Sequence, residues 1–371
     1  MISTPFLPVP PPRYGGTELV VWELVEGLAE AGHEVVLFTA GPSQVRVAVE
    51  VRRRFAETVW PPDPYIEVEH AAWAIGEVIA DGTFDVMHVH CAAALPLSCF
   101  VDVPMVYTLH HERVEPMTAM YARHPAVQLV AISHRQRELL PELDGVSVVW
   151  HGLEPNRYPL GPGGGAPVFL GRLAREKGVH SALDAAERAG VPLTVAGQPH
   201  WKDEGYFNAE VEPRMRLRAE AVRWVGEVAH VEKVPLLGQA PAFLFPIDWE
   251  EPFGLVMIEA MLCGTPVLAL GRGAAPEVIE PGVTGWICED VDTMAERLRA
   301  LCEGRTVWDR ARCRARAVER FGRHRMAREY VEVYERALMK ARWQTPMARI
   351  GDGLGAHPTA GDGVDVGAAS L

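Results

Sequence analysis

The chain has 371 residues, and at roughly 100–200 residues per domain this length predicts two or three domains. Apolar residues make up 48% and charged residues 23%, which are ordinary proportions for a soluble globular protein. The formal net charge of −13 argues against a protein that wraps nucleic acid or binds an anionic membrane, because both need a positive field. No apolar run approaches the roughly 18 residues of a membrane span, and the N-terminus lacks the pattern of a secretory signal.

Two residue types are distributed in an informative way. The six cysteines are scattered and form no CxxC pair, which is typical of free thiols in a reducing cytoplasm. The basic residues comprise four lysines against 32 arginines, which we interpret as the coding bias of a GC-rich genome. The lysines are Lys177, Lys202, Lys233 and Lys340. A cytoplasmic protein is therefore expected, and against this background a lysine inside a motif, as Lys177 is, becomes informative.

The first 153 residues alternate short β-branched runs with longer amphipathic ones. Strands are predicted at 2–6, 34–38, 85–90, 105–108, 128–132 and 147–150. Helices are predicted at 18–31, with Thr17 as a plausible N-cap, and near 65–80 and 133–140. A loop rich in Pro and Gly joins the first strand to the first helix.

A second region of the same kind follows a predicted linker. Residues 154–167 show no hydrophobic periodicity and are rich in Pro and Gly. Beyond them, over 168–319, strands are predicted at 168–170, 193–196, 222–225, 242–246, 266–270 and 285–288, with helices from 179 and near 231–237, 255–262 and 293–303. This alternation predicts an α/β protein of two doubly wound, Rossmann-like domains whose ligand-binding edges face each other across a cleft.

The C-terminal section divides in two. Residues 305–340 are arginine-rich and favour a helix, and we interpret their arginines as a solvated face, with a membrane-binding or phosphate-binding patch as the alternative. These side chains are Arg310, Arg312, Arg314, Arg316, Arg320 and Arg323. The tail 345–371 is rich in Gly, Ala and Asp and has almost no bulky apolar residues, so it is expected to be disordered.

The loop GRLAREKG, residues 171–178, lies between a predicted strand and a predicted helix. It directs Arg172, Lys177 and the free N–H groups of the helix start toward one place. A bidentate guanidinium and a compact ammonium group would suit a diphosphate there. The alternative is a solvated loop with two ordinary surface cations.

The segment WEEPFGLVMIEAMLCGTPV, residues 249–267, begins in a loop and continues as a helix. Pro252 disfavours helical geometry at Glu251, and the N–H groups at the helix start can bind an anion. Glu259 lies one turn inside a helix that is apolar nearly all round, and a buried carboxylate needs a partner. We expect one carboxylate to bind a sugar and the other to bind a ribose. The alternative is that Glu251 interacts favourably with the helix dipole and that Glu259 is a solvated surface residue. The N–H groups at the helix start are those of Phe253, Gly254, Leu255 and Val256.

The first domain offers a glycine loop and two pairs of histidines. In PPRYGGTE, residues 11–18, the glycines let the backbone approach a ligand closely, although the pattern is not GxGxxG and supports a nicotinamide site only weakly. His88 and His90 face one side of a strand, and His110 and His111 end the next strand at the sheet edge. We interpret His110 as a cleft residue, with a satisfied core histidine as the alternative. No further metal ligands appear at a recognisable spacing, so no metal site is predicted.

Together these motifs resemble the family-four retaining glycosyltransferases of the GT-B fold. The resemblance covers nearly the whole chain, and the glutamate pair with seven residues between its members is specific in combination with GRLAREKG. The other segments that carry it are PPRYGGTE, FDVMHVH, VYTLHH, LVAISHRQR, LTVAG, VRWVGEV and APEVIEPGVTGWI. The sub-pattern of PPRYGGTE with FPIDWEEPFGLVMIEAM is similar to that of proteins described as UDP-glucose:tetrahydropterin glucosyltransferases.

The resemblance implies a nucleotide diphosphate sugar, with a UDP-sugar favoured, bound in the C-terminal domain. Arg172 and Lys177 would bind its diphosphate, Glu259 the ribose hydroxyls and Glu251 the sugar hydroxyls, while His110 would lie beside the transferred hexose. The leaving phosphate would take the proton of the acceptor, with retention of the anomeric configuration and without metal or cofactor. The donor cradle would be completed by Gly15, Gly16, Gly197, Phe253, Gly254, Leu255 and Val256.

The resemblance also implies how the rest of the chain is used. A C-terminal helix at about 320–341 would cross back onto the first domain. The acceptor is expected around Glu18, His90 and His111, a polar lining that favours a small polar molecule over a lipid. Where relatives commonly carry Asn-Gly after the strand near 150, this chain has His151-Gly152, so a different hinge turn is expected. A sugar-nucleotide epimerase of the same fold and a non-catalytic sugar-nucleotide-binding protein stay open as alternatives, and the oligomeric state is not specified.

Overall fold

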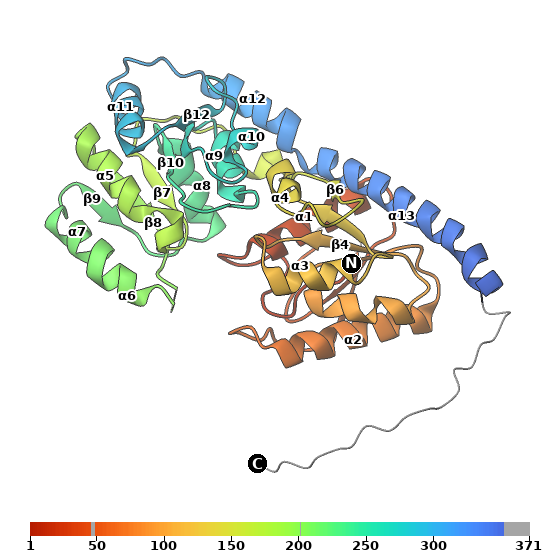
Figure 1. The fold of residues 1–371 in the computed structure, drawn as a ribbon. Coiled ribbons are helices and arrows are strands. Elements are labelled where there is room, and N and C mark those ends of the chain that lie inside the picture. The colour runs from red at the N-terminus through yellow and green to blue at the C-terminus, as the bar shows by residue number, and fades with distance from the viewer. Residues whose placement is uncertain (46–48, 201, 352–371) are drawn as a thin grey trace, which may run out of the picture.

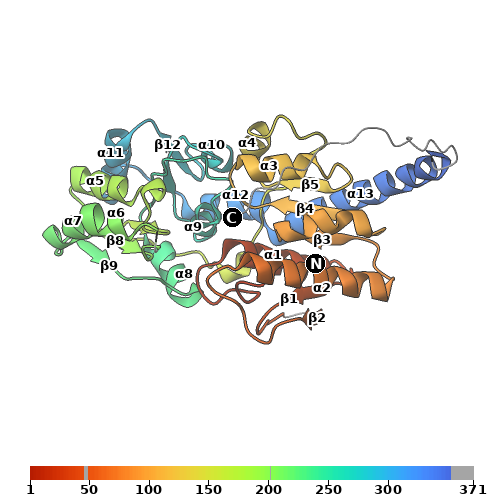
Figure 2. The same ribbon diagram turned by 60° about the horizontal axis from the view of Figure 1, so that its bottom comes forward.

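The computed structural model describes residues 1–45, 49–200 and 202–351, and it consists of two α/β domains joined by two crossings of the chain (Figure 1). The N-terminal domain is drawn in red to yellow and the C-terminal domain mainly in green to cyan. The blue helices α12 (Arg310–Phe321) and α13 (Arg323–Gly351) run from the C-terminal domain along the N-terminal one, as the turned view of Figure 2 also shows.

A six-stranded parallel sheet forms the centre of the C-terminal domain, in the order β12-β11-β10-β7-β8-β9. The chain winds outward in one direction from β7 and in the other from its neighbour β10, so the carboxyl ends of these two strands border the ligand-binding crevice of a doubly wound sheet. The strands are β7 (Val168–Leu170), β8 (Leu193–Ala196), β9 (Val222–Trp224), β10 (Phe243–Phe245), β11 (Val267–Leu270) and β12 (Gly285–Cys288). The loop GRLAREKG follows β7 and the glutamate segment follows β10.

Both faces of this sheet are covered by helices. Along β10, Phe243 and Phe245 pack into the apolar cluster around α9, whereas Leu244 packs on the opposite face with α5 and α11. The helices and helical turns are η3 (Arg175–Lys177), α5 (Val179–Ala189), α6 (Glu204–Tyr206), η4 (Phe207–Val211), α7 (Glu212–Leu217), α8 (His230–Gln239), α9 (Leu255–Leu262), α10 (Ala275–Val278) and α11 (Val291–Cys302). The helical segment 204–217 was not predicted, because it has many charged residues and only a few apolar ones that pack into the core, so its hydrophobic periodicity is weak.

The N-terminal domain is built on the same plan. Strands β3 (Met87–Val89), β4 (Met105–Leu109), β5 (Gln128–Ala131) and β6 (Ser147–Val148) form a parallel sheet, and β1 (Val36–Thr39) pairs with β2 (Glu50–Arg53). Ile2 bridges both Phe38 and Val89 and so joins the pair to the sheet. The strand predicted at 2–6 is therefore reduced to this bridge, because Pro5 has no N–H to continue the ladder.

Helices of the N-terminal domain start near the predicted positions, at 16, 64 and 134, whereas the helical segments at 92–100 and 115–122 were not predicted. They are α1 (Gly16–Glu30), α2 (Pro64–Asp81), η1 (Ala92–Phe100), α3 (Glu115–Ala122) and α4 (His134–Glu138), with the turn η2 (Pro155–Arg157) in the linker. The expectation that Thr17 caps the first helix was wrong: Gly15 is the N-cap and no side chain bonds to the helix start. The first N–H groups of α1 therefore keep their capacity to bind a ligand.

The two crossings between the domains are hydrogen-bonded to each other. The Leu153 N–H donates to the Phe321 carbonyl at 2.9 Å, and the Arg323 N–H donates to the Leu153 carbonyl at 2.9 Å. The hinge turn that carries His151 needs its glycine, because a Cβ on Gly152 would lie 2.7 Å from the Gly322 carbonyl oxygen. Beyond the crossings, α13 packs along α1 with an apolar stripe. The stripe consists of Met326, Ala327, Tyr330, Val333 and Ala337.

The interpretation of the C-terminal arginines as a solvated face was wrong for most of them. Arg310 donates to four backbone carbonyls of the linker and its neighbours. Arg314 donates to the carbonyls of Pro155 and Tyr158, and Arg320 to two carbonyls of α10. The physical reason is that carbonyls of the linker and those at the C-terminal ends of α8, α9 and α10 have no partners in regular structure, so side chains of the adjacent helix supply the donors.

Arg323 is fully buried and forms the centre of an ion-pair network at the crossings. Its Nε donates to Glu23 Oε2 at 2.7 Å and its Nη1 to Glu30 at 2.9 Å. Burial raises the pKa of Glu23 to about 6 in spite of this guanidinium. Arg312 is exposed, and Arg316 pairs at the surface with two glutamates.

Helix α13 extends to Gly351, so the first seven residues of the tail expected to be disordered are helical. Residues 352–371 of that tail lie outside the described residues. Among the helices that the structure describes, none is both long and apolar enough to cross a bilayer. All six cysteines are free.

Candidate functional site

The two motifs of the C-terminal domain meet where the sheet order reverses. Lys177 Nζ lies 2.5 Å from Glu251 Oε2, and the Trp249 indole N–H donates to the same oxygen at 2.9 Å. The ammonium group also lies 4.4 Å from the centroid of the Trp249 ring. Lys177 is thus held in one place by a carboxylate and an aromatic face, both contributed by the segment after β10.

The loops around this pair are packed backbone against backbone. Gly178 has a φ of +75°, and a Cβ there would lie 1.9 Å from the Pro246 carbonyl oxygen. Gly197, which follows β8, has a φ of +139°, and a Cβ there would lie 1.8 Å from the carbonyl oxygen of Gly171. A side chain at either position would push apart the loops that hold Lys177 and Arg172.

Arg172 has two acidic partners in the resting site. Its Nη2 donates to Glu176 at 2.7 Å, one turn further along the same loop, and its Nη1 lies 3.6 Å from Asp203. All three side chains are partly exposed. The guanidinium is therefore oriented but accessible, which a group that receives an anion requires.

Glu259 is buried, and two side chains bind one of its carboxylate oxygens. Lys233 Nζ lies 2.5 Å from its Oε1, and the Tyr158 hydroxyl donates to the same oxygen at 2.9 Å. Burial and the neighbouring carboxylate hold the pKa of the Tyr158 hydroxyl well above its usual value. This arrangement excludes the interpretation of Glu259 as a solvated residue. Sequence reasoning missed both partners, although Lys233, as one of only four lysines, carried the same compositional signal as Lys177.

Two helix N-termini, one from each domain, lie next to each other beside these loops. Helix α9 begins at Leu255 after Gly254, whose φ of +86° turns the chain into the helix. Helix α1 of the other domain begins at Gly16, and a Cβ there would lie 3.5 Å from Leu255 Cδ1. Val256 belongs to the first turn of α9, whereas the Phe253 ring is buried and packs into the core. Both helix starts have N–H groups without intrahelical partners, an arrangement that suits an anion.

The N-terminal side of the cleft contributes histidines instead of charged pairs. His110 Nε2 lies 2.8 Å from His90 Nδ1, and the His110 ring stacks at 5.9 Å on that of His151. His151 in turn contacts the Phe253 ring of the other domain at 4.9 Å. Burial lowers the pKa of His110 to about 3 and holds the pKa values of His90 and His151 well below the usual range. These imidazoles are therefore neutral at physiological pH.

The residues expected to bind the acceptor differ in accessibility. His111 is exposed, whereas His90 and Glu18 are buried. The Thr4 hydroxyl donates to Glu18 Oε1 at 2.5 Å, and burial raises the pKa of the Glu18 carboxyl. Glu18 lies in the first turn of α1, so it is close to the helix start that faces α9.

The two domains also contact each other through polar groups beside the cleft. Glu277 on α10 accepts hydrogen bonds from the N–H groups of His134 and Arg135 at 2.9 and 3.0 Å, and from the Trp150 indole at 3.1 Å. Arg135 also donates twice to Glu250, next to Glu251 in the chain. The loop after the first strand contributes a weaker contact, because Arg13 lies 3.5 Å from Glu227.

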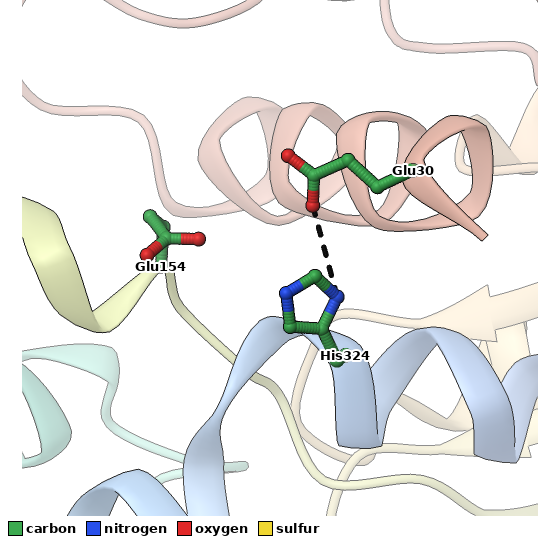
Figure 3. Close-up of side chains that lie close together, drawn as sticks. All are labelled: Glu30, Glu154 and His324. Atoms are coloured by element: carbon green, nitrogen blue, oxygen red, sulfur yellow. Dashed lines mark ion pairs between the residues drawn. The ribbon is translucent and has the colours of Figure 1, made fainter.

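Within the described ranges, a single group of three side chains has the spacing of metal ligands, and it lies near the crossings. Glu30, Glu154 and His324 converge there (Figure 3). Arg323 already pairs with both carboxylates, at 2.9 and 3.6 Å, and His324 lies 3.7 Å from Glu30. These ion pairs explain the cluster without a metal ion.

Comparisons with known proteins agree with this geometry. A family model described as Glycosyltransferase Family 4 matches residues 14–157, and one described as Glycosyl transferases group 1 matches residues 165–320. The chain is 29% identical to a glycogen synthase of Mycobacterium tuberculosis over 353 residues, which cover 79% of this chain and 84% of that protein.

Solved structures support the same assignment. AviGT4, a glycosyltransferase involved in avilamycin A biosynthesis, is 26% identical with a TM-score of 0.68, over 91% of this chain and 97% of that one. HepE of Anabaena, solved with UDP-glucose, has the same fold at 20% identity and a TM-score of 0.68, over 87% and 97% of the two chains. The two family models together span most of the chain, and this protein therefore belongs to the family-four glycosyltransferases and is an enzyme of the GT-B fold.

Proposed function

We propose that this chain is a retaining, cytoplasmic hexosyltransferase that moves a hexose from a UDP-sugar to a small polar acceptor. The observation that carries the proposal is the pairing of Lys177 with Glu251, beside two adjacent helix starts, at the point where the C-terminal sheet reverses its order. The UDP-glucose bound by HepE of Anabaena supports the choice of nucleotide and sugar.

The resting ion pairs suggest how the donor would bind. Its diphosphate would replace Glu251 as the partner of Lys177 and would also engage Arg172 and the N–H groups of Gly16, Leu255 and Val256. The released Glu251 carboxylate could then accept hydrogen bonds from the sugar hydroxyls. Glu259, oriented by Lys233, would accept those of the ribose. The remaining cradle residues, Gly15, Gly197, Phe253 and Gly254, would shape the site through the backbone.

The transfer step follows from these positions. The acceptor hydroxyl would attack the anomeric carbon on the face from which the diphosphate leaves, forming the new glycosidic bond as the bond to phosphate breaks. The acceptor proton would pass to the departing phosphate oxygen. Lys177 and Arg172 would stabilise the negative charge that develops there, and contacts between the domains would exclude water. No step in this scheme uses a metal ion.

The acceptor would bind against the N-terminal domain, near Glu18, His90 and the exposed His111. The polar character of this lining supports a small hydroxylated or heterocyclic acceptor. A tetrahydropterin is one specific candidate, because of the sub-pattern in PPRYGGTE and the segment after β10.

The experiment is an incubation of the purified protein with UDP-glucose and a panel of acceptors that includes a tetrahydropterin, followed by mass spectrometry. A hexosylated product together with free UDP is expected. Conversion of the sugar nucleotide without any acceptor would establish an epimerase instead. Binding of UDP with neither product from a metabolite extract would establish a non-catalytic binding protein.

A further inference from the structure

We propose that His90 is a positioning residue that fixes the tautomer of His110, so that His110 meets its ligand as a hydrogen-bond acceptor only. The structural part of this inference stands on the contacts of the two imidazoles. Its catalytic consequence rests on the proposed function, in which His110 lies beside the transferred sugar.

The geometry is a line of three side chains. His90 Nε2 lies 3.0 Å from the Sδ atom of Met1, and His90 Nδ1 lies 2.8 Å from His110 Nε2. His90 is buried directly after the end of β3. His88, two residues earlier on that strand, has its own partners, Thr108 and Tyr334, at 2.8 Å each. The two nitrogens of His90 therefore have one side-chain partner each.

The proton positions follow from the chemistry of those partners. A thioether sulfur has no proton to donate, so the contact with Met1 is a hydrogen bond only if His90 Nε2 carries the hydrogen. In a neutral imidazole the other nitrogen, His90 Nδ1, then has a lone pair and must accept. The hydrogen in the second contact is consequently on His110 Nε2. His110 Nδ1 is left as a lone pair.

The surroundings keep both rings neutral, which the argument requires. Burial depresses the pKa of both histidines, because the buried surroundings disfavour the charged form of each ring. The stacked ring of His151 occupies one side of His110. A hydrogen-bond acceptor at Nδ1 recognises a hydroxyl group and rejects a carbonyl or a carboxylate, so the pair selects a hydroxyl of the sugar.

The direct test is nuclear magnetic resonance of the full-length protein labelled with ¹⁵N-histidine. The ring nitrogen shifts should show His110 with a protonated Nε2 and an unprotonated Nδ1. In His90→Asn, the side-chain oxygen can take the place of Nδ1 as acceptor, so this tautomer should persist. In His90→Phe the acceptor is lost, and a mixture of tautomers is expected. A protonated Nδ1 in the wild type, or an unchanged single tautomer in His90→Phe, would overturn the inference.

A kinetic test follows on the same variants, each first compared with the wild type by thermal unfolding. His90→Phe should lower kcat about 10-fold or more while the Kd for UDP stays within about two-fold, and His90→Asn should recover most of the loss, as expected for one hydrogen bond. Equal losses in both variants would overturn the positioning role. If the wild type transfers no sugar but the tautomers behave as stated, the proposed function fails and the assignment of His90 stands.

Discussion

The two walls of the cleft are built from different chemistry. On the C-terminal side, Glu251 and Glu259 each have a lysine at 2.5 Å. On the N-terminal side, His90, His110 and His151 are stacked and hydrogen-bonded, and burial depresses their pKa values. One wall is thus ionic and the other is polar but neutral.

This difference shows how electrostatics can direct the phosphates of a nucleotide sugar to one wall and its sugar to the other. A lysine paired with a glutamate is stable without ligand, yet it can exchange the carboxylate for a phosphate when the donor arrives. A neutral imidazole offers hydrogen bonds to a sugar without adding a charge that would favour a second phosphate. The predictions below test each wall separately and then the contact between them, from the largest expected effect to the smallest.

Lys177→Ala should have the largest effect, because it removes the ammonium group closest to the expected leaving phosphate. We expect kcat to fall about 10²–10³-fold, the usual cost of losing one preorganised donor to a developing negative charge. Steady-state UDP release measures it. Lys340→Ala, on α13 far from the cleft, is the matched control and should retain wild-type activity. If Lys177→Ala is as active as this control, Lys177 does not stabilise the leaving phosphate.

Glu259→Gln should act on binding more than on the chemical step. The amide keeps the shape but loses the charge that Lys233 and Tyr158 engage, so the donor KM should rise about 10-fold or more with a smaller change in kcat. Removing the charge also leaves Lys233 without its counter-ion, and thermal unfolding should show a lower Tm. The double variant Lys233→Met/Glu259→Gln should recover part of that Tm. A fall in kcat at constant KM would contradict a role in binding the ribose.

The neutral wall should make the free energy of unfolding depend on pH. An unfolded histidine binds a proton below about pH 6.5, whereas the folded form of His110 does so only near pH 3. Stability is therefore present above pH 6.5 and is lost as the pH falls, at up to about 1.4 kcal/mol per pH unit for each such histidine. Glu23 works in the opposite direction between about pH 6 and 4.5, since burial raises the pKa of its carboxyl to about 6.

Urea unfolding at pH 7.5 and 5.5 measures this dependence. His88→Gln, which keeps a polar side chain between Thr108 and Tyr334, should reduce the slope, because burial holds the pKa of His88 well below its usual value. The exposed His33→Gln is the matched control. Equal slopes in the wild type and in His88→Gln would show that His88 accepts a proton in the folded state as readily as in the unfolded state.

The ionic wall could be predicted from the sequence more fully than the neutral one. Motifs after β7 and β10 are local, and the reversal of sheet order brings them together, so Lys177 and Glu251 were expected in one site and lie 2.5 Å apart. Lys233 and Tyr158 escaped prediction because their partner Glu259 is distant in the chain. Their positions depend on how the linker and α8 pack on α9, which no short pattern encodes.

The histidine row and the arginines show the same limit. His90 and His110 were placed at the sheet edge by strand periodicity, but their mutual contact depends on the neighbouring register of β3 and β4. Arg310 and Arg314 have the spacing of a solvated helix face, but they are structural because they donate to carbonyls of the linker and of the ends of α8 and α9. Spacing indicates which side chains share a face, whereas what covers that face is decided by tertiary packing.

The smallest effect is expected from a change in the contact between the two domains, where Glu277 binds the start of α4. Glu277→Gln keeps one side-chain oxygen but replaces the other with an NH2 group, so one of the two N–H groups at the start of α4 loses its acceptor and the charge is removed. The contact between the domains should lose about 1 kcal/mol and kcat/KM should fall about five-fold. Small-angle scattering should report a slightly larger radius of gyration without donor. Glu319→Gln, which removes a surface partner of Arg316, is the control. Because neither wall is altered, kcat at saturating donor should be nearly unchanged, and a large loss of kcat would mean that the joint between the domains takes part in the chemical step itself.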